Sequence, residues 1–183
     1  MKLKLEEAVI TEVRRLINGD RVCIDTCTKM RRGQGILIGS TSRGLFLVHS
    51  ESIKNPYVAP RRFRVNAGAL CEYTLVEGKK TKYLSEVSAG DKILIVDYKG
   101  NAKEAVIGRS KMEKRPLILI KAMYKNDEIP LILQNAETVR LTDPKGYPIS
   151  VVNLHKGSKV LIYPPEEKGR HFGMGIDETI IEK

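Results

Sequence analysis

The stretch Gly35-Ile-Leu-Ile-Gly-Ser-Thr-Ser-Arg-Gly-Leu-Phe-Leu-Val-His-Ser-Glu51 contains two apolar runs with a short polar segment between them. The runs, Ile36–Ile38 and Leu45–Val48, consist of residues that favour strands, and glycines border the polar segment. This pattern predicts two core strands joined by a loop. Hydroxyls, free backbone donors and one guanidinium in that loop suit an anionic group. A surface hairpin with a soluble turn is the alternative.

A second pattern recurs three times along the chain. In each copy two spaced apolar residues lead to a glycine, a polar residue, a cation and an apolar strand; the copies are Val13–Val22, Leu84–Ile93 and Val151–Val160. We expect the glycines, Gly19, Gly90 and Gly157, to take positive φ and turn the chain into each strand. The repetition predicts recurring β units similar to those of small cradle-loop and SH3-like barrels.

The remaining segments also favour strands. Lys99-Gly100-Asn101 predicts a hairpin between strands at 93–96 and 105–108. Further strands are expected at 117–120, 129–133, 137–141 and 179–181, whereas 6–16 fits a helix or a strand and 52–69 is irregular. The fold class is therefore all-β, made of small barrel-like units with little helix. We expect units at 1–75 and 76–183, or one continuous domain.

Composition narrows the classes of function. The 183 residues are 42% hydrophobic and 30% charged, as in an ordinary globular protein, and the net charge is +10. The cations are scattered, aromatic residues are 5% and tryptophan is absent, so a stacking surface for nucleic acid is poorly supported. No apolar run approaches the roughly 20 residues of a membrane span, and no signal peptide is evident. Three cysteines favour a reducing cytoplasm.

Cys23 and Cys27 have a spacing that zinc ligands can use, with Asp25 and Thr26 between them. The third cysteine supplies no second pair, and the histidines lie far away in sequence. Buried structural cysteines are therefore expected, and no metal site is.

Three further segments carry polar groups that could bind a ligand. Arg61, Arg62 and Arg64 precede Asn66, and arginine suits carboxylate or phosphate recognition, although a solvated basic loop has the same composition. Asn135 and Glu137 follow an apolar run and can orient a hydroxylated ligand or cap a turn. Arg170 and His171 lie within a glycine-dense segment. The G-x-G-x-x-G pattern of a Rossmann turn is not found in a strand-to-helix context.

These segments together resemble a known family. The motifs are Arg21-Val-Cys-Ile-Asp-Thr-Cys27, Leu37–Glu51, Asn55-Pro-Tyr57, Arg64-Val-Asn-Ala-Gly68, Lys82-Tyr-Leu84, Leu133–Val139, Gly169-Arg-His-Phe-Gly173 and Glu178–Glu182. In content and order they resemble the C-terminal half of the archaeal-type 3-dehydroquinate synthase II. The resemblance covers the whole chain.

The resemblance implies an enzyme of aromatic amino-acid biosynthesis. Its reaction is the NAD-dependent oxidative deamination and cyclisation of 2-amino-3,7-dideoxy-D-threo-hept-6-ulosonate to 3-dehydroquinate. Family members carry an α/β segment ahead of this half, so we expect a partner half, in the same or a separate chain. A basic β-barrel that binds nucleic acid and a structural barrel that supports another chain are the alternatives.

The reaction suggests roles for the residues identified above. An arginine clamp would hold the substrate carboxylate, and a base and a proton donor would serve amine oxidation and ring closure. The catalytic candidates are His49, Glu51, Lys82 and His171; the substrate-binding candidates are Arg61, Arg64, Asn66, Asn135, Glu137 and Arg170. The cofactor candidates are Gly39, Ser40, Ser42 and Arg43. We expect distant turns to converge on a single pocket.

Overall fold

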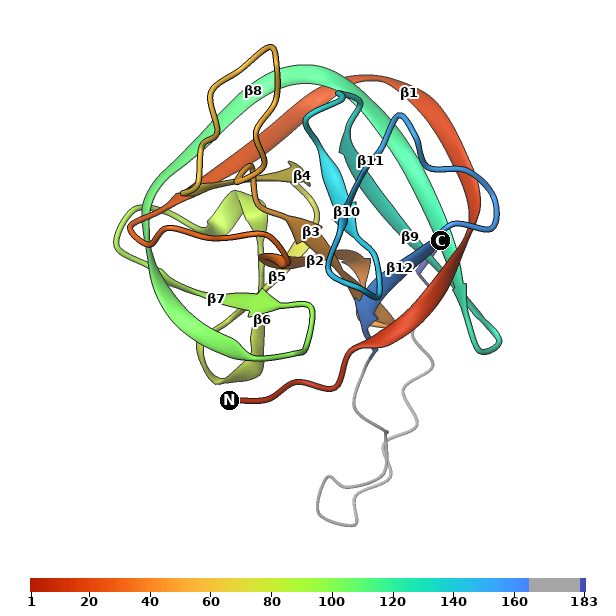
Figure 1. The fold of residues 1–183 in the computed structure, drawn as a ribbon, viewed down its shortest axis with the longest axis horizontal. Coiled ribbons are helices and arrows are strands. Elements are labelled where there is room, and N and C mark those ends of the chain that lie inside the picture. Colours follow the sequence, from red (N-terminus) through yellow and green to blue (C-terminus); the bar gives the residue numbers. More distant parts are fainter. Residues whose placement is uncertain (165–181) are drawn as a thin grey trace.

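The protein is an antiparallel β structure whose strands close into a ring (Figure 1). The computed structural model describes residues 1–164 and 182–183. Six strands pair successively around the ring: β1 (Glu6–Thr26), β8 (Ala102–Tyr124), β7 (Lys92–Asp97), β2 (Gln34–Thr41), β3 (Gly44–His49) and β12 (Lys159–Tyr163). This closure confirms the prediction of an all-β, barrel-like fold, and it leaves no open edge among the six strands of the ring.

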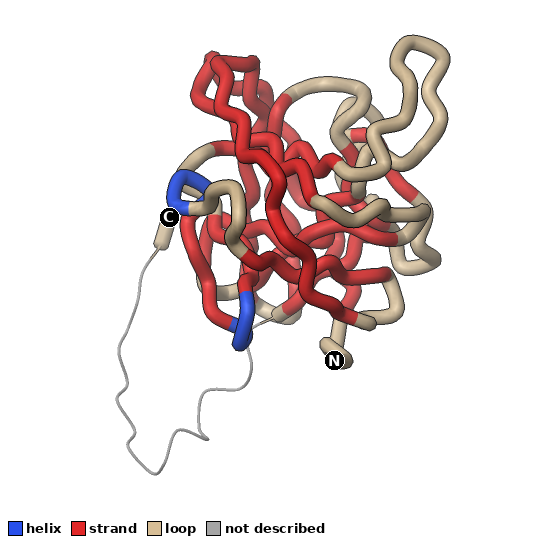
Figure 2. Tube along the Cα trace, turned by 90° about the vertical axis from the view of Figure 1, so that its left-hand side faces the viewer, coloured by secondary structure: helices blue, strands red, loops and turns tan. Residues whose placement is uncertain are grey.

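Shorter strands extend this ring. They are β4 (Arg64–Ala69) on β1, β9 (Asp127–Gln134) on β8, β5 (Tyr73–Val76) on β2, β6 (Lys80–Tyr83) on β5, β10 (Arg140–Thr142) on β3, and β11 (Pro148–Ser150) on β10. The described helices are two single 3₁₀ turns, η1 (Glu77–Lys79) and η2 (Leu84–Glu86). Figure 2 shows strands throughout the body and loops concentrated at one end.

Two long strands wrap around the molecule. β1 and β8 pair from Val9 opposite Met123 to Thr26 opposite Ile107, with irregularities in register. Pro116 of β8 lies opposite Asn18 of β1, next to the irregularity between Arg15 and Asn18, where a missing ladder hydrogen bond is tolerated. The strands expected at 105–108 and 117–120 are therefore parts of one strand, and 6–16 is strand rather than helix.

The quoted hairpin forms the centre of the core. Every residue of β3 is buried, because the two faces of the strand contact different apolar clusters. Ile36, Phe46 and Val48 belong to the large inner cluster, whereas Leu37 and Leu47 pack in the smaller one on the other face. A strand covered on both faces reads as a continuous apolar run, which is why this stretch was informative.

Two of the three repeated glycines behave as expected. Gly90 and Gly157 have φ of 94° and 98° and precede β7 and β12. Each donates its N–H to an isoleucine carbonyl on a long strand: Gly90 to Ile107 and Gly157 to Ile10. Gly19 instead lies within β1, opposite Arg115, so the expected turn is replaced by continuous strand near a bulge.

The boundaries of several other elements differ from those predicted from the sequence. The expected strand at 137–141 is a turn until β10 begins at Arg140, and the irregular segment expected at 52–69 ends where β4 begins at Arg64. The expected strand at 179–181 lies outside the described residues. The division near residue 75 stays a prediction; β1 and β2 nevertheless pair with strands from beyond that point.

Within the part of the chain that is described, no helix has the length and apolarity that crossing a membrane requires.

Candidate functional site

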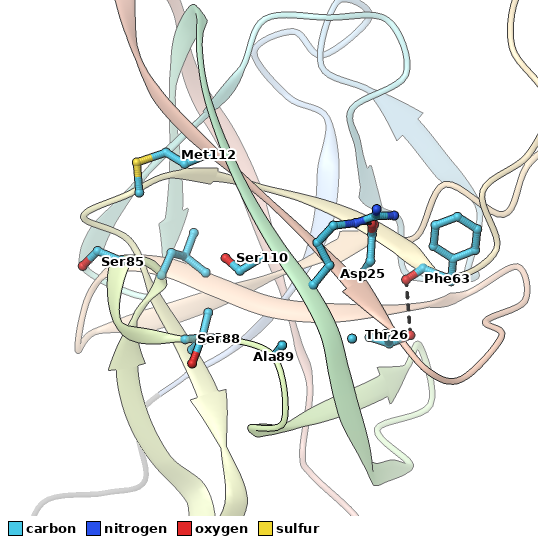
Figure 3. Close-up of a pocket in the computed structure, with 12 residues that line it drawn as sticks. Asp25, Thr26, Phe63, Ser85, Ser88, Ala89, Ser110 and Met112 are labelled. Carbon is cyan, nitrogen blue, oxygen red and sulfur yellow. Dashed lines mark hydrogen bonds and ion pairs between the residues drawn. The ribbon is translucent and has the colours of Figure 1, made fainter.

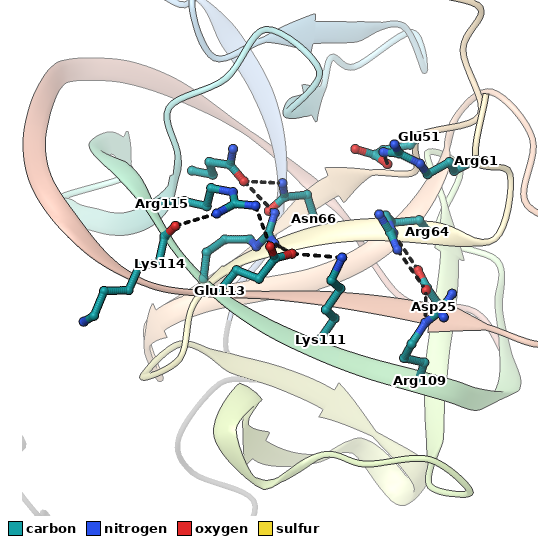
Figure 4. Close-up of polar contacts among 12 residues, drawn as sticks. Asp25, Glu51, Arg61, Arg64, Asn66, Arg109, Lys111, Glu113, Lys114 and Arg115 are labelled. Atoms are coloured by element: carbon teal, nitrogen blue, oxygen red, sulfur yellow. Dashed lines mark hydrogen bonds and ion pairs between the residues drawn. The ribbon is translucent and has the colours of Figure 1, made fainter. Parts of the chain in front are cut away.

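Oppositely charged side chains from three neighbouring strands meet at the end of the barrel where β3 ends (Figure 4). Asp25 on β1 lies opposite Arg64 on β4 and opposite Arg109 on β8. Arg64 donates through Nε and Nη2 to the two Asp25 oxygens at 2.7 and 3.0 Å, and Arg109 Nε donates to Oδ2 at 2.8 Å. Strand pairing thus places one carboxylate between two guanidiniums. We call Asp25, Glu51, Arg61, Arg64 and Arg109 the rim cluster.

Burial and pairing compete at Asp25. The side chain is 6% exposed, and burial acts to raise its pKa. Hydrogen bonds and charge from Arg64 and Arg109 outweigh burial, so the pKa of Asp25 is lowered. The pKa of Arg64 is raised mainly by its hydrogen bonds to Asp25. The pair therefore stays charged at neutral pH, and the fork of Arg64 is engaged by Asp25.

A buried amide network adjoins the rim cluster. Asn66 Nδ2 and Arg21 Nη1 both donate to Gln134 Oε1, at 2.8 and 2.7 Å, and Arg21 Nη2 donates to Glu113 at 3.0 Å. Asn66 and Arg21 are 5% and 6% exposed. Asn66 Oδ1 and Arg21 Nε have no partner among the described residues. This buried network therefore has one acceptor and one donor that a ligand or an ordered water can satisfy.

A pocket of about 590 Å³ opens beside the rim cluster (Figure 3). Its polar lining comprises one carboxylate, one guanidinium and hydroxyls, from Asp25, Arg109, Thr26, Ser85, Ser88 and Ser110. The size and the groups suit a small hydroxylated anion.

Glu51 and Arg61 form the second ion pair of the rim cluster, at 3.4 Å, across an isolated β-bridge. They line a cavity of about 20 Å³ together with Thr138 and Arg140. That volume holds about one water. The Glu51 carboxylate, 10% exposed, therefore faces a water-sized space bordered by two arginines.

His49 lies two residues before Glu51 of the rim cluster and is only 2% exposed. Its Nε2 accepts a hydrogen bond from the Gly33 N–H at 2.8 Å, so Nδ1 carries the hydrogen and donates to the Ser50 carbonyl at 2.7 Å. Burial, with smaller contributions from Arg140 and Arg32, lowers the pKa of His49 to about 4, against the Ser50 hydrogen bond. The ring is therefore neutral at physiological pH, and both nitrogens are engaged.

The predicted cofactor loop lies at the opposite end of the hairpin. From Gly35, opposite His49, to Thr41, opposite Gly44, β2 rises about 20 Å at roughly 3.3 Å per residue. There Ser42 N–H and Oγ donate to Glu182 Oε1 at 3.2 and 3.1 Å, and Arg43 Nη2 donates to the Glu182 carbonyl at 3.1 Å. The loop does hold an anionic group, namely a carboxylate of the same chain. Gly39, next to it in β2, is buried.

Ser40 reaches a different carboxylate. Its Oγ lies 2.7 and 2.6 Å from the two oxygens of Glu72, and the Ile132 N–H donates to Oε1 at 3.0 Å. Glu72 is fully buried, and burial raises its pKa to about 7 in spite of these hydrogen bonds.

The remaining predicted residues fall into three groups. Asn135 follows β9 beside the amide network and donates its N–H to Pro116, and the exposed Glu137 lies two residues further on. Lys82 is exposed on β6, toward the end that holds the cofactor loop. Arg170 and His171 lie outside the described residues. The structure thus brings Glu51, Arg61, Arg64 and Asn66 together and separates them from Lys82 and from the cofactor loop.

Comparison with known proteins identifies the family. A family model described as the 3-dehydroquinate synthase II C-terminal domain matches residues 7–183. The chain belongs to this family.

Curated relatives agree with the family model. The chain is 63% identical over 182 residues to a 3-dehydroquinate synthase of Methanocaldococcus jannaschii, and all of the chain aligns with 50% of that relative. It is 55% identical to a 3-dehydroquinate synthase of Methanopyrus kandleri, covering 46% of it, and 54% identical to a 3-dehydroquinate synthase homolog of Aquifex aeolicus, covering 55%. The chain therefore spans about half the length of these relatives.

In this 3-dehydroquinate synthase II domain, sequence reasoning missed Arg109, Arg21 and Glu72. Each is a single charged residue within or beside a strand, a pattern shared with many solvated positions. The only usable signal was the polar interruption Gly108-Arg109-Ser110 between strand-like runs. The expectation of buried cysteines was correct for Cys23 but wrong for Cys27, which is exposed.

Proposed function

We propose that this domain is the C-terminal part of a 3-dehydroquinate synthase. With an N-terminal half, it would use NAD to deaminate 2-amino-3,7-dideoxy-D-threo-hept-6-ulosonate oxidatively and cyclise it to 3-dehydroquinate. The observation that carries this proposal is the family match over residues 7–183, together with 63% identity to a protein named 3-dehydroquinate synthase.

The pocket of about 590 Å³ and the rim cluster beside it together supply groups that an acidic, hydroxylated substrate needs. Arg109 is 62% exposed and engages Asp25 through Nε, so its other N–H groups can bind a substrate carboxylate. Arg61, 41% exposed, is the second candidate. Arg64, engaged by Asp25, would position Asp25 and Arg109 rather than contact the carboxylate. Asn66, Asn135 and Glu137 remain candidates for the hydroxyl groups.

Glu51 is the base that the geometry favours. Its carboxylate faces a cavity beside Arg61 that holds about one water, and through that water it can accept a proton from a bound amine or carbon acid. His49 would have to break its hydrogen bond with Gly33 before Nε2 could accept a proton. Its hydrogen bond to the Ser50 carbonyl instead fixes the backbone that leads to Glu51. Lys82 and His171 remain predicted contributors to ring closure.

NAD, when bound, would accept hydride from the amine-bearing carbon. The loop containing Gly39, Ser40, Ser42 and Arg43 fits an anionic part of such a cofactor, because Ser42 already holds the Glu182 carboxylate there and Arg43 donates to the Glu182 backbone carbonyl. The separation of about 20 Å between this loop and His49, along a strand rising roughly 3.3 Å per residue, requires an extended cofactor or a contribution from the N-terminal half.

Reconstitution with the N-terminal half tests the proposal. The chain is combined with that half, and formation of reduced nicotinamide and 3-dehydroquinate is measured with the amino-sugar acid. We expect Arg109→Gln to raise KM about tenfold or more, the value of one charged hydrogen bond, with a smaller change in kcat. Arg14→Gln is the matched control, because Arg14 is 59% exposed and pairs with Glu12 on β1. Failure to form either product with both halves present contradicts the proposed function.

A further inference from the structure

A second pocket, of about 540 Å³, lies at the end of the barrel that carries the β2–β3 turn. The N-terminal segment, that turn, η1, the β8–β9 turn and the end of β12 all contribute to it. Its lining has five cationic side chains, from Lys2, Lys4, Arg43, Lys79 and Lys125, against the carboxylates of Glu6 and Asp127. We call it the turn-end pocket. Its charge surplus favours an anionic ligand.

A buried donor in this pocket also indicates a missing acceptor. Arg43 Nε is buried and has no hydrogen-bond partner among the described residues, although Nη2 of the same guanidinium donates to Glu182. A buried guanidinium N–H without an acceptor is costly, so a shift of the Arg43 side chain that brings this N–H to an oxyanion in the pocket would be favourable.

Backbone strain is concentrated at the same place. In the described part of the chain two non-glycine residues have positive φ, Lys79 at 58° and Lys125 at 52°, and both line the turn-end pocket. Such conformations cost of order 1 kcal/mol or more and cluster at ligand sites. Here they bring two lysines from distant turns to one cavity.

We propose that the turn-end pocket binds a diphosphate-bearing ligand. Lys2, Lys79, Lys125 and Arg43 surround its phosphate oxygens, and one of those oxygens accepts from the Arg43 guanidinium. The carboxylate of Glu182, held by Ser42 beside Arg43, is the internal competitor of that ligand. Inorganic pyrophosphate and a dinucleotide such as NAD both carry the diphosphate that the pocket would recognise. Naming NAD as the ligand rests on the proposed function. The existence of an oxyanion site in this pocket is independent of that function.

Titration of the chain with inorganic pyrophosphate at constant ionic strength tests the site, with calorimetry as the readout. We expect Arg43→Gln to weaken binding about tenfold or more, as loss of a charged hydrogen bond does. Lys125→Gln should weaken it less. Lys145→Gln, a lysine in the exposed β10–β11 turn, is the control and should leave the affinity unchanged.

The Glu182→Gln substitution should change the affinity for pyrophosphate in the opposite direction. Removing the competing negative charge should tighten pyrophosphate binding about threefold, the value of an exposed ion pair. No saturable binding, or equal weakening by Arg43→Gln and Lys145→Gln, would overturn the site.

Competition with NAD separates this inference from the proposed function. Displacement of pyrophosphate by NAD supports both. Saturable pyrophosphate binding that NAD does not displace supports the oxyanion site and contradicts its assignment to the cofactor. Pyrophosphate binding that persists when the reconstituted enzyme makes no product likewise leaves the site standing while the proposed function fails.

Discussion

Two buried carboxylates at opposite ends of the β2–β3 hairpin have opposite pKa shifts. As whole residues, Asp25, in the rim cluster, is 4% exposed and Glu72, beside Ser40, is 0% exposed. Burial raises the pKa of each, yet the pKa of Asp25 ends below its usual value and that of Glu72 rises to about 7. The difference is that Asp25 contacts two guanidiniums, whereas Glu72 contacts a hydroxyl and a backbone N–H. The partners, rather than the depth of burial, decide which carboxylate keeps its charge.

The comparison also separates two kinds of region. At the rim, opposite charges on neighbouring strands compensate each other, and the substrate pocket that we propose lies beside them. At the turn end the buried acid tends toward its neutral form, and the cations of the turn-end pocket outnumber the carboxylates. The first region is stabilised by its own ion pairs, and the second is left to attract an anion.

The largest expected effect is at Asp25. Asp25→Asn removes the charge that compensates Arg64, whose side chain is 13% exposed, and should lower the free energy of unfolding by about 3–5 kcal/mol. Asp20→Asn on the same strand is the control; the Asp20 pair with Lys114 spans 3.5 Å at the surface and should contribute less than about 1 kcal/mol. Urea unfolding at pH 7 measures both. If the two variants lose similar amounts of unfolding free energy, then Asp25 does not stabilise the fold by compensating the charge of Arg64.

The next effect is a pH dependence at Glu72. Its pKa is about 7 when folded and 4.5 as a free group, so the folded state binds the proton more tightly. The resulting stability is complete below pH 4.5 and is lost as pH rises through 7, a loss of about 3 kcal/mol. Glu72→Gln keeps hydrogen bonding to Ser40 and Ile132 but cannot ionise.

Unfolding free energies of the wild type and the Glu72→Gln variant, measured from pH 4 to pH 8, test this expectation. The wild type should lose stability relative to the variant as pH rises. Parallel pH profiles would mean that Glu72 is not held neutral by burial.

The smallest expected effect is the pH dependence of stability caused by His49, a buried base rather than a buried acid. The pKa of His49 is about 4 when folded against 6.5 as a free group, so its contribution to stability is complete above pH 6.5 and is lost as pH falls through 4. At pH 5 the loss is about 2 kcal/mol. Relative to His49→Gln, the wild type should therefore become less stable between pH 7 and pH 5, the reverse of the slope at Glu72. A slope of the same sign in both comparisons would contradict the rule that burial favours the neutral form.

Sequence reasoning was most accurate where the signal was local. The strands of the quoted hairpin were predicted because both are buried on two faces and therefore continuously apolar. Gly90 and Gly157 were predicted because positive φ strongly favours glycine. β8 was not predicted as one strand, since its exposed charges and Pro116 resemble breaks in a chain read without its partner β1.

The candidate site was predictable only in part. Glu51, Arg61, Arg64 and Asn66 were noticed because they lie in or beside irregular segments, and the structure gathers them at one rim. Arg109 was not, because its importance comes from its register opposite Asp25, and register between strands about 84 residues apart leaves no local trace.

The sequence by itself determined the β class, the central hairpin, two of the turns and membership of the family, because each depends on residue types at short spacing. The tertiary structure alone decided which charges compensate each other, which carboxylate is held neutral and where cations outnumber carboxylates. Those properties depend on distance and burial, and strand pairing sets both between residues that are remote along the chain.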